Sequence, residues 1–99
     1  MCGILAVNSN RNYSFQLESS IHAIDHRGPD DNGIFTSNDG GCHLGHVRLS
    51  IIDLSERANQ PFVDEPSGLS LVFNGTIYNY PALRQTLQSK GHTFISTGD

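Results

Sequence analysis

Basic side chains are few in this chain. Six Lys and Arg residues stand against ten Asp and Glu, which gives a net charge of −4 at pH 7. Non-specific nucleic-acid binding depends on Lys and Arg neutralising phosphates, so this balance argues against a nucleic-acid partner. Long apolar runs are also missing, since no segment approaches the roughly 20 residues that span a bilayer. We therefore expect neither nucleic acid nor membrane as a partner.

Cysteine is scarce, with only Cys2 and Cys42 in the chain. The N-terminus lacks the charged start and the apolar stretch of about 7–15 residues that mark a secretory signal. We therefore expect a cytoplasmic location, where both thiols stay reduced and form no disulfide. The two Asn-x-Ser/Thr sequons, at Asn12 and Asn74, then carry no glycan.

The chain shows no internal repeat, no low-complexity segment and no linker that would divide it. Its 99 residues suit one domain or a piece of one. Because Asp99 directly follows a strand-like stretch, we expect a truncated domain.

Local patterns predict an α+β fold with mostly antiparallel sheets. Leu17, Ile21 and Ile24 form one stripe of a helix expected from Ser14 to His26, with Ser14 as a candidate N-cap. A second helix begins at Pro81 and stops at Gly91. The other expected segments are strands at 2–8, 34–37, 42–53, 69–73 and 92–97, a loop at 26–33, a turn at 38–41, and an extended connection at 55–68.

Cys2 combines two chemical functions if the initiator methionine is removed. Its free α-amine then titrates near 7.7–8.0, where a general base works best at neutral pH. The amine can take the thiol proton and later return it to a leaving amine, which is the logic of N-terminal-nucleophile hydrolases. The alternative is that Cys2 is only a small buried side chain in a first strand.

Two further sites have competing interpretations. Asn74 and Gly75 could supply an amide NH2 and a backbone N–H to an oxyanion, but Asn-Gly between two β-rich runs is also typical of a hairpin. Arg48 lies in an otherwise apolar strand, where it could bind a ligand carboxylate or reach solvent by its long stem.

Five sequence blocks in order give the chain a clear family resemblance. They are CGI at 2–4, HRGPD at 26–30, GHVRLSIIDL at 45–54, QP at 60–61 and NGTIYNY at 74–80. The set resembles the class II glutamine amidotransferase domain, most closely that of glutamine-hydrolysing asparagine synthase. The resemblance implies the first half of an αββα sandwich, with residues 1–99 as the N-terminal portion of the domain and the ATP-using synthetase domain absent.

The resemblance also implies roles for individual residues. Cys2 would be the nucleophile, Asn74 and Gly75 the oxyanion hole, and Arg48 the ligand of the glutamine carboxylate. Asp99 would bind the substrate ammonium, while HRGPD frames the site with Arg27 and Asp30 paired. The backbone that lines the glutamine pocket would come from Leu49, Ser50, Ile51 and Ile52.

The implied reaction is glutamine hydrolysis with delivery of ammonia to a synthetase domain that amidates aspartate in asparagine biosynthesis. This chain would need no cofactor or metal itself, and ATP and Mg would belong to the synthetase domain. A homodimer is left open. Alternatives are a sugar or other metabolite as acceptor, or an inactive fragment that serves as a binding module. Thr76 motivates the last, because the family usually places glutamate there to hold the substrate ammonium.

A zinc site is a weak alternative. Cys42, His43 and His46 form a C-H-x-x-H cluster, but on a strand residues 42 and 46 share one face while 43 points away. We expect Cys42 in the core and His22 and His92 on the surface.

Overall fold

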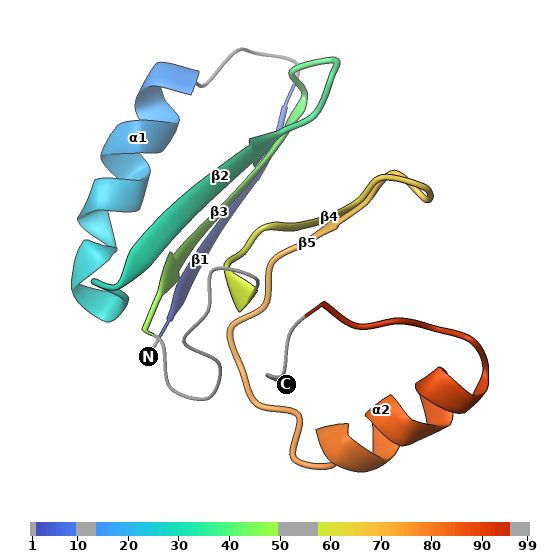
Figure 1. The fold of residues 1–99 in the computed structure, drawn as a ribbon. Helices are drawn as coiled ribbons and strands as arrows, with labels where there is room; N and C mark the ends of the chain where they lie inside the picture. Colours follow the sequence, from blue (N-terminus) through green and yellow to red (C-terminus); the bar gives the residue numbers. More distant parts are fainter. Residues whose placement is uncertain (1, 10–13, 50–57, 96–99) are drawn as a thin grey trace.

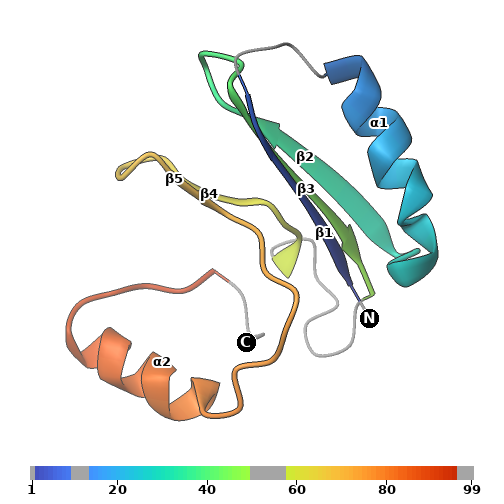
Figure 2. The same cartoon turned by 180° about the vertical axis from the view of Figure 1, so that it is seen from behind.

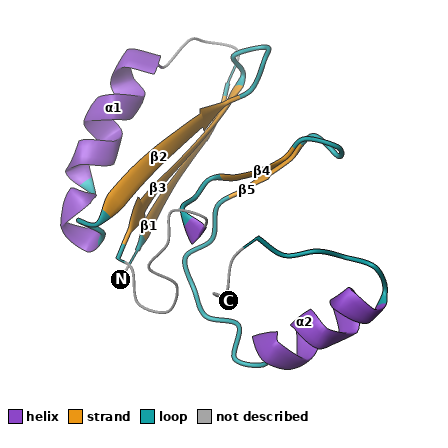
Figure 3. Ribbon diagram, viewed as in Figure 1, coloured by secondary structure: helices purple, strands orange, loops and turns teal. Residues whose placement is uncertain are grey.

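The computed structural model describes residues 2–9, 14–49 and 58–95. In these ranges a three-stranded antiparallel sheet joins β1 (Gly3–Asn8), β2 (Asp31–Thr36) and β3 (Cys42–Arg48) in the order β1-β3-β2 (Figure 1). A separate antiparallel pair joins β4 (Phe62–Asp64) and β5 (Leu69–Leu71). The helices are α1 (Ser14–Ala23), the 3-10 turn η1 (Asp25–Arg27) and α2 (Tyr80–Ser89) (Figure 3). The predicted α+β class is confirmed.

Helix α1 covers one face of the three-stranded sheet (Figures 1 and 2). Leu17 is 2% exposed and Ile21 3%, so two members of the predicted stripe form the core with Val47 of β3. A Cβ on Gly45 would lie 2.5 Å from the Ile21 Cδ1 atom, which shows how closely the helix approaches the strand. Burial of each large side chain stabilises the fold by about 1.5–3 kcal/mol.

Strand β3 is covered on both faces. The contact at Gly45 places odd-numbered residues on the α1 face, where the Nδ1 atom of fully buried His43 lies 3.0 Å from the Thr36 hydroxyl. Even-numbered residues face the other way and include His46, 1% exposed, and Arg48, 7% exposed. The β4–β5 pair lies toward this second face (Figures 1 and 2). Polar side chains are therefore buried on the face away from α1.

Two predicted boundaries are wrong around residues 24–33. The first helix ends at Ala23, and Arg27 N donates to the Ile24 carbonyl in an i, i+3 bond of η1. Strand β2 begins at Asp31, not at Ile34, because residues 31–33 pair with the end of β3. Pairing with a buried strand outweighs the turn preference of the Asp-Asn-Gly triplet.

Strand β3 ends at Arg48, whereas the prediction extended to residue 53; residues 50–53 lie outside the described part. Cys42 is half-buried, so the prediction that it lies in the core is wrong. Ser14 as an N-cap stays a prediction.

The hairpin interpretation of Asn74-Gly75 is wrong. The hairpin is instead β4–β5, where Gly68 adopts a φ of 73° and donates its N–H to the Asp64 carbonyl. Strand β4 lies in the stretch predicted as a plain connection, and residues 92–95 form no strand. The limits of the second helix agree with the prediction to within one residue, since α2 begins at Tyr80 with Pro81 in its first turn and ends at Ser89, and Gly91 has a φ of 93°.

Helix α2 stands apart from the sheet (Figure 2), and none of the residues of α2 is buried in the part of the chain that the structure describes. Leu83 is 44% exposed and Leu87 37%. The radius of gyration is 14.5 Å, above the roughly 13 Å typical of a compact domain of this size. The core is therefore concentrated between α1 and the three-stranded sheet.

Candidate active site

Cys2 lies at the edge of the three-stranded sheet, one residue before β1. The register pairs Gly3 with Val47, so one step back places Cys2 across from Arg48 on the face opposite α1. Leu49 N–H points at the Cys2 Sγ atom at 3.4 Å. The Arg27 Nε atom donates to the Cys2 carbonyl at 3.0 Å. Both contacts hold a residue that would otherwise fray with the chain terminus.

The loop after η1 is fixed against the same end of β3. Asp30 N donates to the Arg48 carbonyl at 3.0 Å, and Pro29 forms a parallel bridge to Arg48. A Cβ on buried Gly28 would lie 2.5 Å from the Arg48 backbone nitrogen, so only glycine allows this approach. The HRGPD segment is thus a frame that places Arg27 beside Cys2. Pairing of Arg27 with Asp30 stays a prediction.

Arg48 does not reach solvent by its stem, because only 7% of the residue is exposed. Its Nη1 atom donates to the Asn59 side-chain oxygen, and the Asn59 amide donates in turn to the Asp31 carboxylate. A buried guanidinium needs such acceptors. The site therefore combines a half-buried thiol with a buried positive charge on the neighbouring strand.

His46 is the next residue toward the sheet centre on this face. Burial lowers the pKa of His46; the nearby Arg48 charge adds to this, and the Phe73 backbone opposes it. Among the described residues neither ring nitrogen has a hydrogen-bond partner. The ring is therefore neutral at pH 7, and Phe73 lies close to the face that carries Cys2 and Arg48.

Asn74 and Gly75 follow Phe73 in the exposed connection from β5 to α2. Phe73 N donates to the Gln60 side chain at 2.6 Å, which ties the start of this connection to the segment that carries Asn59. A Cβ on Gly75 would lie 2.7 Å from the tip of the Phe73 ring, so this ring packs directly over Gly75. In the described part of the chain no hydrogen bond joins Asn74 or Gly75 to Cys2.

The structure thus brings together three of the predicted site residues, namely Cys2, Arg48 and Leu49. Thr76 is exposed beside Gly75. Ser50, Ile51, Ile52 and Asp99 lie outside the described residues.

Sequence reasoning missed Asn59 and Asp31 as the polar partners of Arg48. Asn59 precedes the Gln-Pro pair of the family motif, and Asp31 lies in a segment of loop composition. The one signal for such acceptors in the sequence is the arginine itself, because a charge within an apolar strand requires polar partners.

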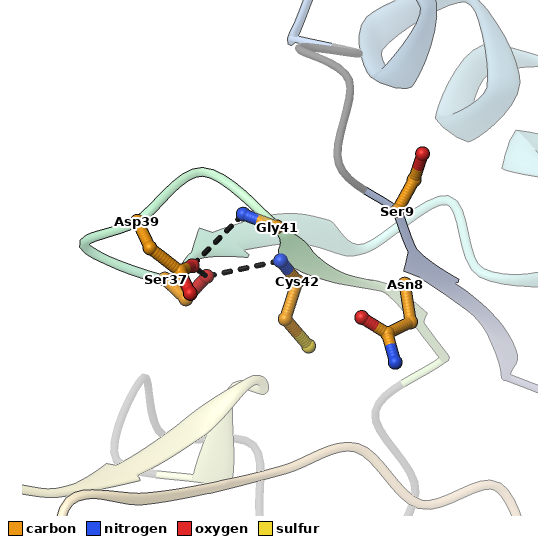
Figure 4. A pocket seen from close by; sticks show the side chains of 6 residues that line it. All are labelled: Asn8, Ser9, Ser37, Asp39, Gly41 and Cys42. Carbon is orange, nitrogen blue, oxygen red and sulfur yellow. Dashed lines mark hydrogen bonds between the residues drawn. The ribbon is translucent and has the colours of Figure 1, made fainter.

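A shallow depression at the other end of the sheet is lined by the turn between β2 and β3 and by the end of β1 (Figure 4). Ser37 Oγ and Gly41 N donate to the Asp39 carboxylate at 2.6 and 2.9 Å, which lowers the pKa of Asp39. These bonds close the turn, so they need no ligand to explain them.

Cys42 borders this depression as a free thiol. Six strand positions, or about 20 Å, separate its register position from that of Cys2. The two cysteines therefore cannot form a disulfide within the chain, as predicted.

Metal-ligand side chains do not gather in the described ranges, where no group of three His, Cys, Asp or Glu could hold an ion. His43 points toward α1 while His46 faces the opposite side, so the C-H-x-x-H cluster diverges. No helix in the same ranges is long and apolar enough to cross a membrane. His22 and His92 are exposed, as predicted.

Comparison with known sequences decides the family. The family described as glutamine amidotransferase domain matches residues 1–99. The chain belongs to this family. It is the N-terminal part of a class II glutamine amidotransferase domain, and the resemblance seen in the five blocks is confirmed.

Curated relatives include two kinds of enzyme. A probable glutamine-hydrolysing asparagine synthetase of Dictyostelium discoideum is 39% identical over 104 aligned residues, covering 100% of this chain and 18% of that protein. An amidase of Gibberella zeae is 45% identical over 84 residues, covering 85% of this chain and 12% of that protein. A glutamine-hydrolysing asparagine synthetase of Bacillus subtilis is 46% identical over 76 residues, covering 77% and 12%. The chain thus spans less than a fifth of each relative.

Proposed function

We propose that this glutamine amidotransferase domain hydrolyses glutamine through Cys2. The observation that carries the proposal is the position of Cys2 across from buried Arg48, on the same face at one edge of the sheet. The thiol supplies a nucleophile, and the guanidinium supplies the cation that an amino-acid carboxylate requires. Family membership supports glutamine as the substrate.

The proposed reaction has two balanced steps. With Met1 removed, the Cys2 α-amine takes the thiol proton while sulfur attacks the side-chain carbonyl of glutamine. The carbon–nitrogen bond breaks, the amine returns the proton to the leaving group, and ammonia departs from a γ-glutamyl thioester. Water then cleaves the thioester to give glutamate and the free thiol.

The remaining roles extend this mechanism. Asn74 and Gly75 donate to the oxyanion, a contribution of about 2.7–4 kcal/mol per donor in other acyl-transfer enzymes. Residues 49–52 line the pocket, and Asp99 holds the ammonium. The described α1 layer and sheet belong, in this proposal, to an αββα sandwich. No metal takes part in these steps.

We further propose that the ammonia serves an ATP- and Mg-dependent synthetase domain that amidates aspartate. The asparagine synthetases among the relatives motivate this acceptor. The Gibberella zeae amidase shows that the relatives are not all asparagine synthetases, so the second candidate is a different acceptor for the same ammonia. Assays with aspartate and with other acceptors, on a protein in which this domain is joined to its synthetase domain, separate the two.

Covalent labelling tests the glutaminase proposal. Intact mass should show the protein without Met1, and a glutamine-analogue electrophile should add one equivalent to Cys2. Cys2→Ser should abolish the adduct, while Cys42→Ser should leave it unchanged. Retention of Met1, or an adduct that survives Cys2→Ser, would contradict the proposal and leave the domain as a binding module.

A further inference from the structure

Two hydrogen bonds connect Arg48 to Asp31 through the side chain of Asn59. The Arg48 guanidinium is the positive end, the Asn59 amide is the neutral middle, and the Asp31 carboxylate is the negative end. Arg48 Nη1 donates to the Asn59 side-chain oxygen at 2.5 Å, and the Asn59 NH2 donates to the Asp31 carboxylate. The cation at one end is buried, with 7% of the residue exposed. The Asn59 amide therefore separates the buried Arg48 cation from the Asp31 carboxylate.

The separation is notable because the backbone places Arg48 and Asp31 next to each other. They are register partners on β3 and β2, and such partners have Cβ atoms about 4.5–5.5 Å apart on the same face. A direct ion pair is thus within reach of their side chains. Asn59 lies between them because its segment packs directly against β2 at Gly33. A Cβ on Gly33 would collide with the Gln60 carbonyl oxygen, so the absence of a side chain there allows this close contact.

We propose that Asn59 is a positioning residue that orients Arg48 for a ligand carboxylate while keeping Asp31 from neutralising the guanidinium. This inference rests on the proposed role of Arg48 in binding glutamine. An amide oxygen fixes one N–H of the fork through a dipole and leaves the positive charge intact. A carboxylate in its place would form a charge-assisted pair, and the glutamine carboxylate would have to compete with it.

The charge-order swap Asp31→Asn with Asn59→Asp tests the idea in the full chain. It preserves net charge, side-chain size and the number of hydrogen bonds, but it moves the negative charge one link closer to Arg48. We expect the glutamine KM to rise about tenfold, because the glutamine carboxylate must displace a charge-assisted pair, and one such pair changes a binding equilibrium by about tenfold or more. The kcat should stay within about twofold. An unchanged rate of Cys2 alkylation by iodoacetamide, which has no carboxylate, should show that the thiol is undisturbed.

Single variants separate charge placement from structure. Asp31→Asn alone keeps the neutral amide on Arg48, so KM should stay within about threefold. Asn59→Ala removes the hold on the guanidinium without adding charge, so it should raise KM less than the swap does. If the swap does not fold, a KM increase at constant kcat in Asn59→Ala supports the proposal, and an unchanged KM overturns it.

The outcomes distinguish this inference from the function on which it rests. A wild-type protein that takes no glutamine-analogue label at Cys2 overturns the proposed function and the inference together. A labelled wild type whose swap variant keeps its KM overturns the inference alone. A larger effect of Asn59→Ala than of the swap also overturns it, because that order indicates a merely structural role.

Discussion

The Arg27 guanidinium donates from Nε to the carbonyl of Cys2 at 3.0 Å, although 25 positions separate the two residues in the sequence. This bond fixes the orientation of the first residue after Met1, so it also fixes where its thiol and α-amine point. Small displacements of reacting groups are costly in rate.

Arg27→Ala should therefore lower kcat by about 10- to 100-fold while the protein stays folded. The measurement is glutaminase turnover in the full chain together with thermal unfolding. Arg84→Ala, which removes the same charge from α2, is the control and should leave kcat unchanged. Equal effects of the two variants would mean that net charge, and not the contact with Cys2, is responsible.

Gly28 and Gly45 provide a matched pair for stability. A Cβ at either site would meet a neighbour at 2.5 Å, but the neighbour is the Arg48 backbone nitrogen for Gly28 and the tip of the Ile21 side chain for Gly45. A side chain can change rotamer, whereas a strand backbone must move. Gly28→Ala should thus lower the free energy of unfolding by about 1 kcal/mol more than Gly45→Ala, as measured by denaturant titration. The reverse order would show that the loop after η1 is free to shift.

Part of the fold and of the candidate site can be predicted from the sequence. Local patterns located β1, α1 and α2, because periodicity, Pro81 and Gly91 are readable within a few residues. They also placed Arg48 and Cys2 among the candidate residues.

Other features depend on contacts between distant segments. Strand β4 is three residues long and exists only by pairing with β5, so it carries no periodic signal. Residues 31–33 have turn composition but extend along β3. The bond from Arg27 to Cys2 and the amide between Arg48 and Asp31 likewise join segments far apart in the chain, which no local pattern reports.

The core between α1 and the sheet sets the stability of this part of the chain. Ile21 is 3% exposed and contacts the Gly45 position, so Ile21→Ala should lower the free energy of unfolding by about 2–5 kcal/mol. Leu83→Ala on α2 is the control, since Leu83 is 44% exposed and its loss should change little. Chemical denaturation measures both, and similar losses would mean that α2 is packed in solution.

His46 should make stability depend on pH. Burial lowers its pKa, so the unfolded chain binds a proton more readily than the folded one once the pH falls below about 6.5. The stabilisation is then present at pH 7 and is lost progressively as the pH falls toward 5. His46→Gln should reduce this loss in thermal unfolding measured at both pH values, whereas His22→Gln, at an exposed site, should not. A steep acid loss that persists in His46→Gln would assign it to other groups.

Thr76 is exposed beside Gly75, at the position where the family resemblance leads us to expect glutamate. If the glutamine ammonium binds near this residue, Thr76→Glu should lower the glutamine KM, because a carboxylate there attracts the cation. Solvent screening at an exposed site limits the gain to under about 1 kcal/mol, so the KM should fall by about two- to fivefold with kcat unchanged. Gln85→Glu adds the same charge on α2 and should leave KM as it is. A KM that falls equally in both variants would indicate a general effect of charge, and one that falls in neither would place the ammonium away from residue 76.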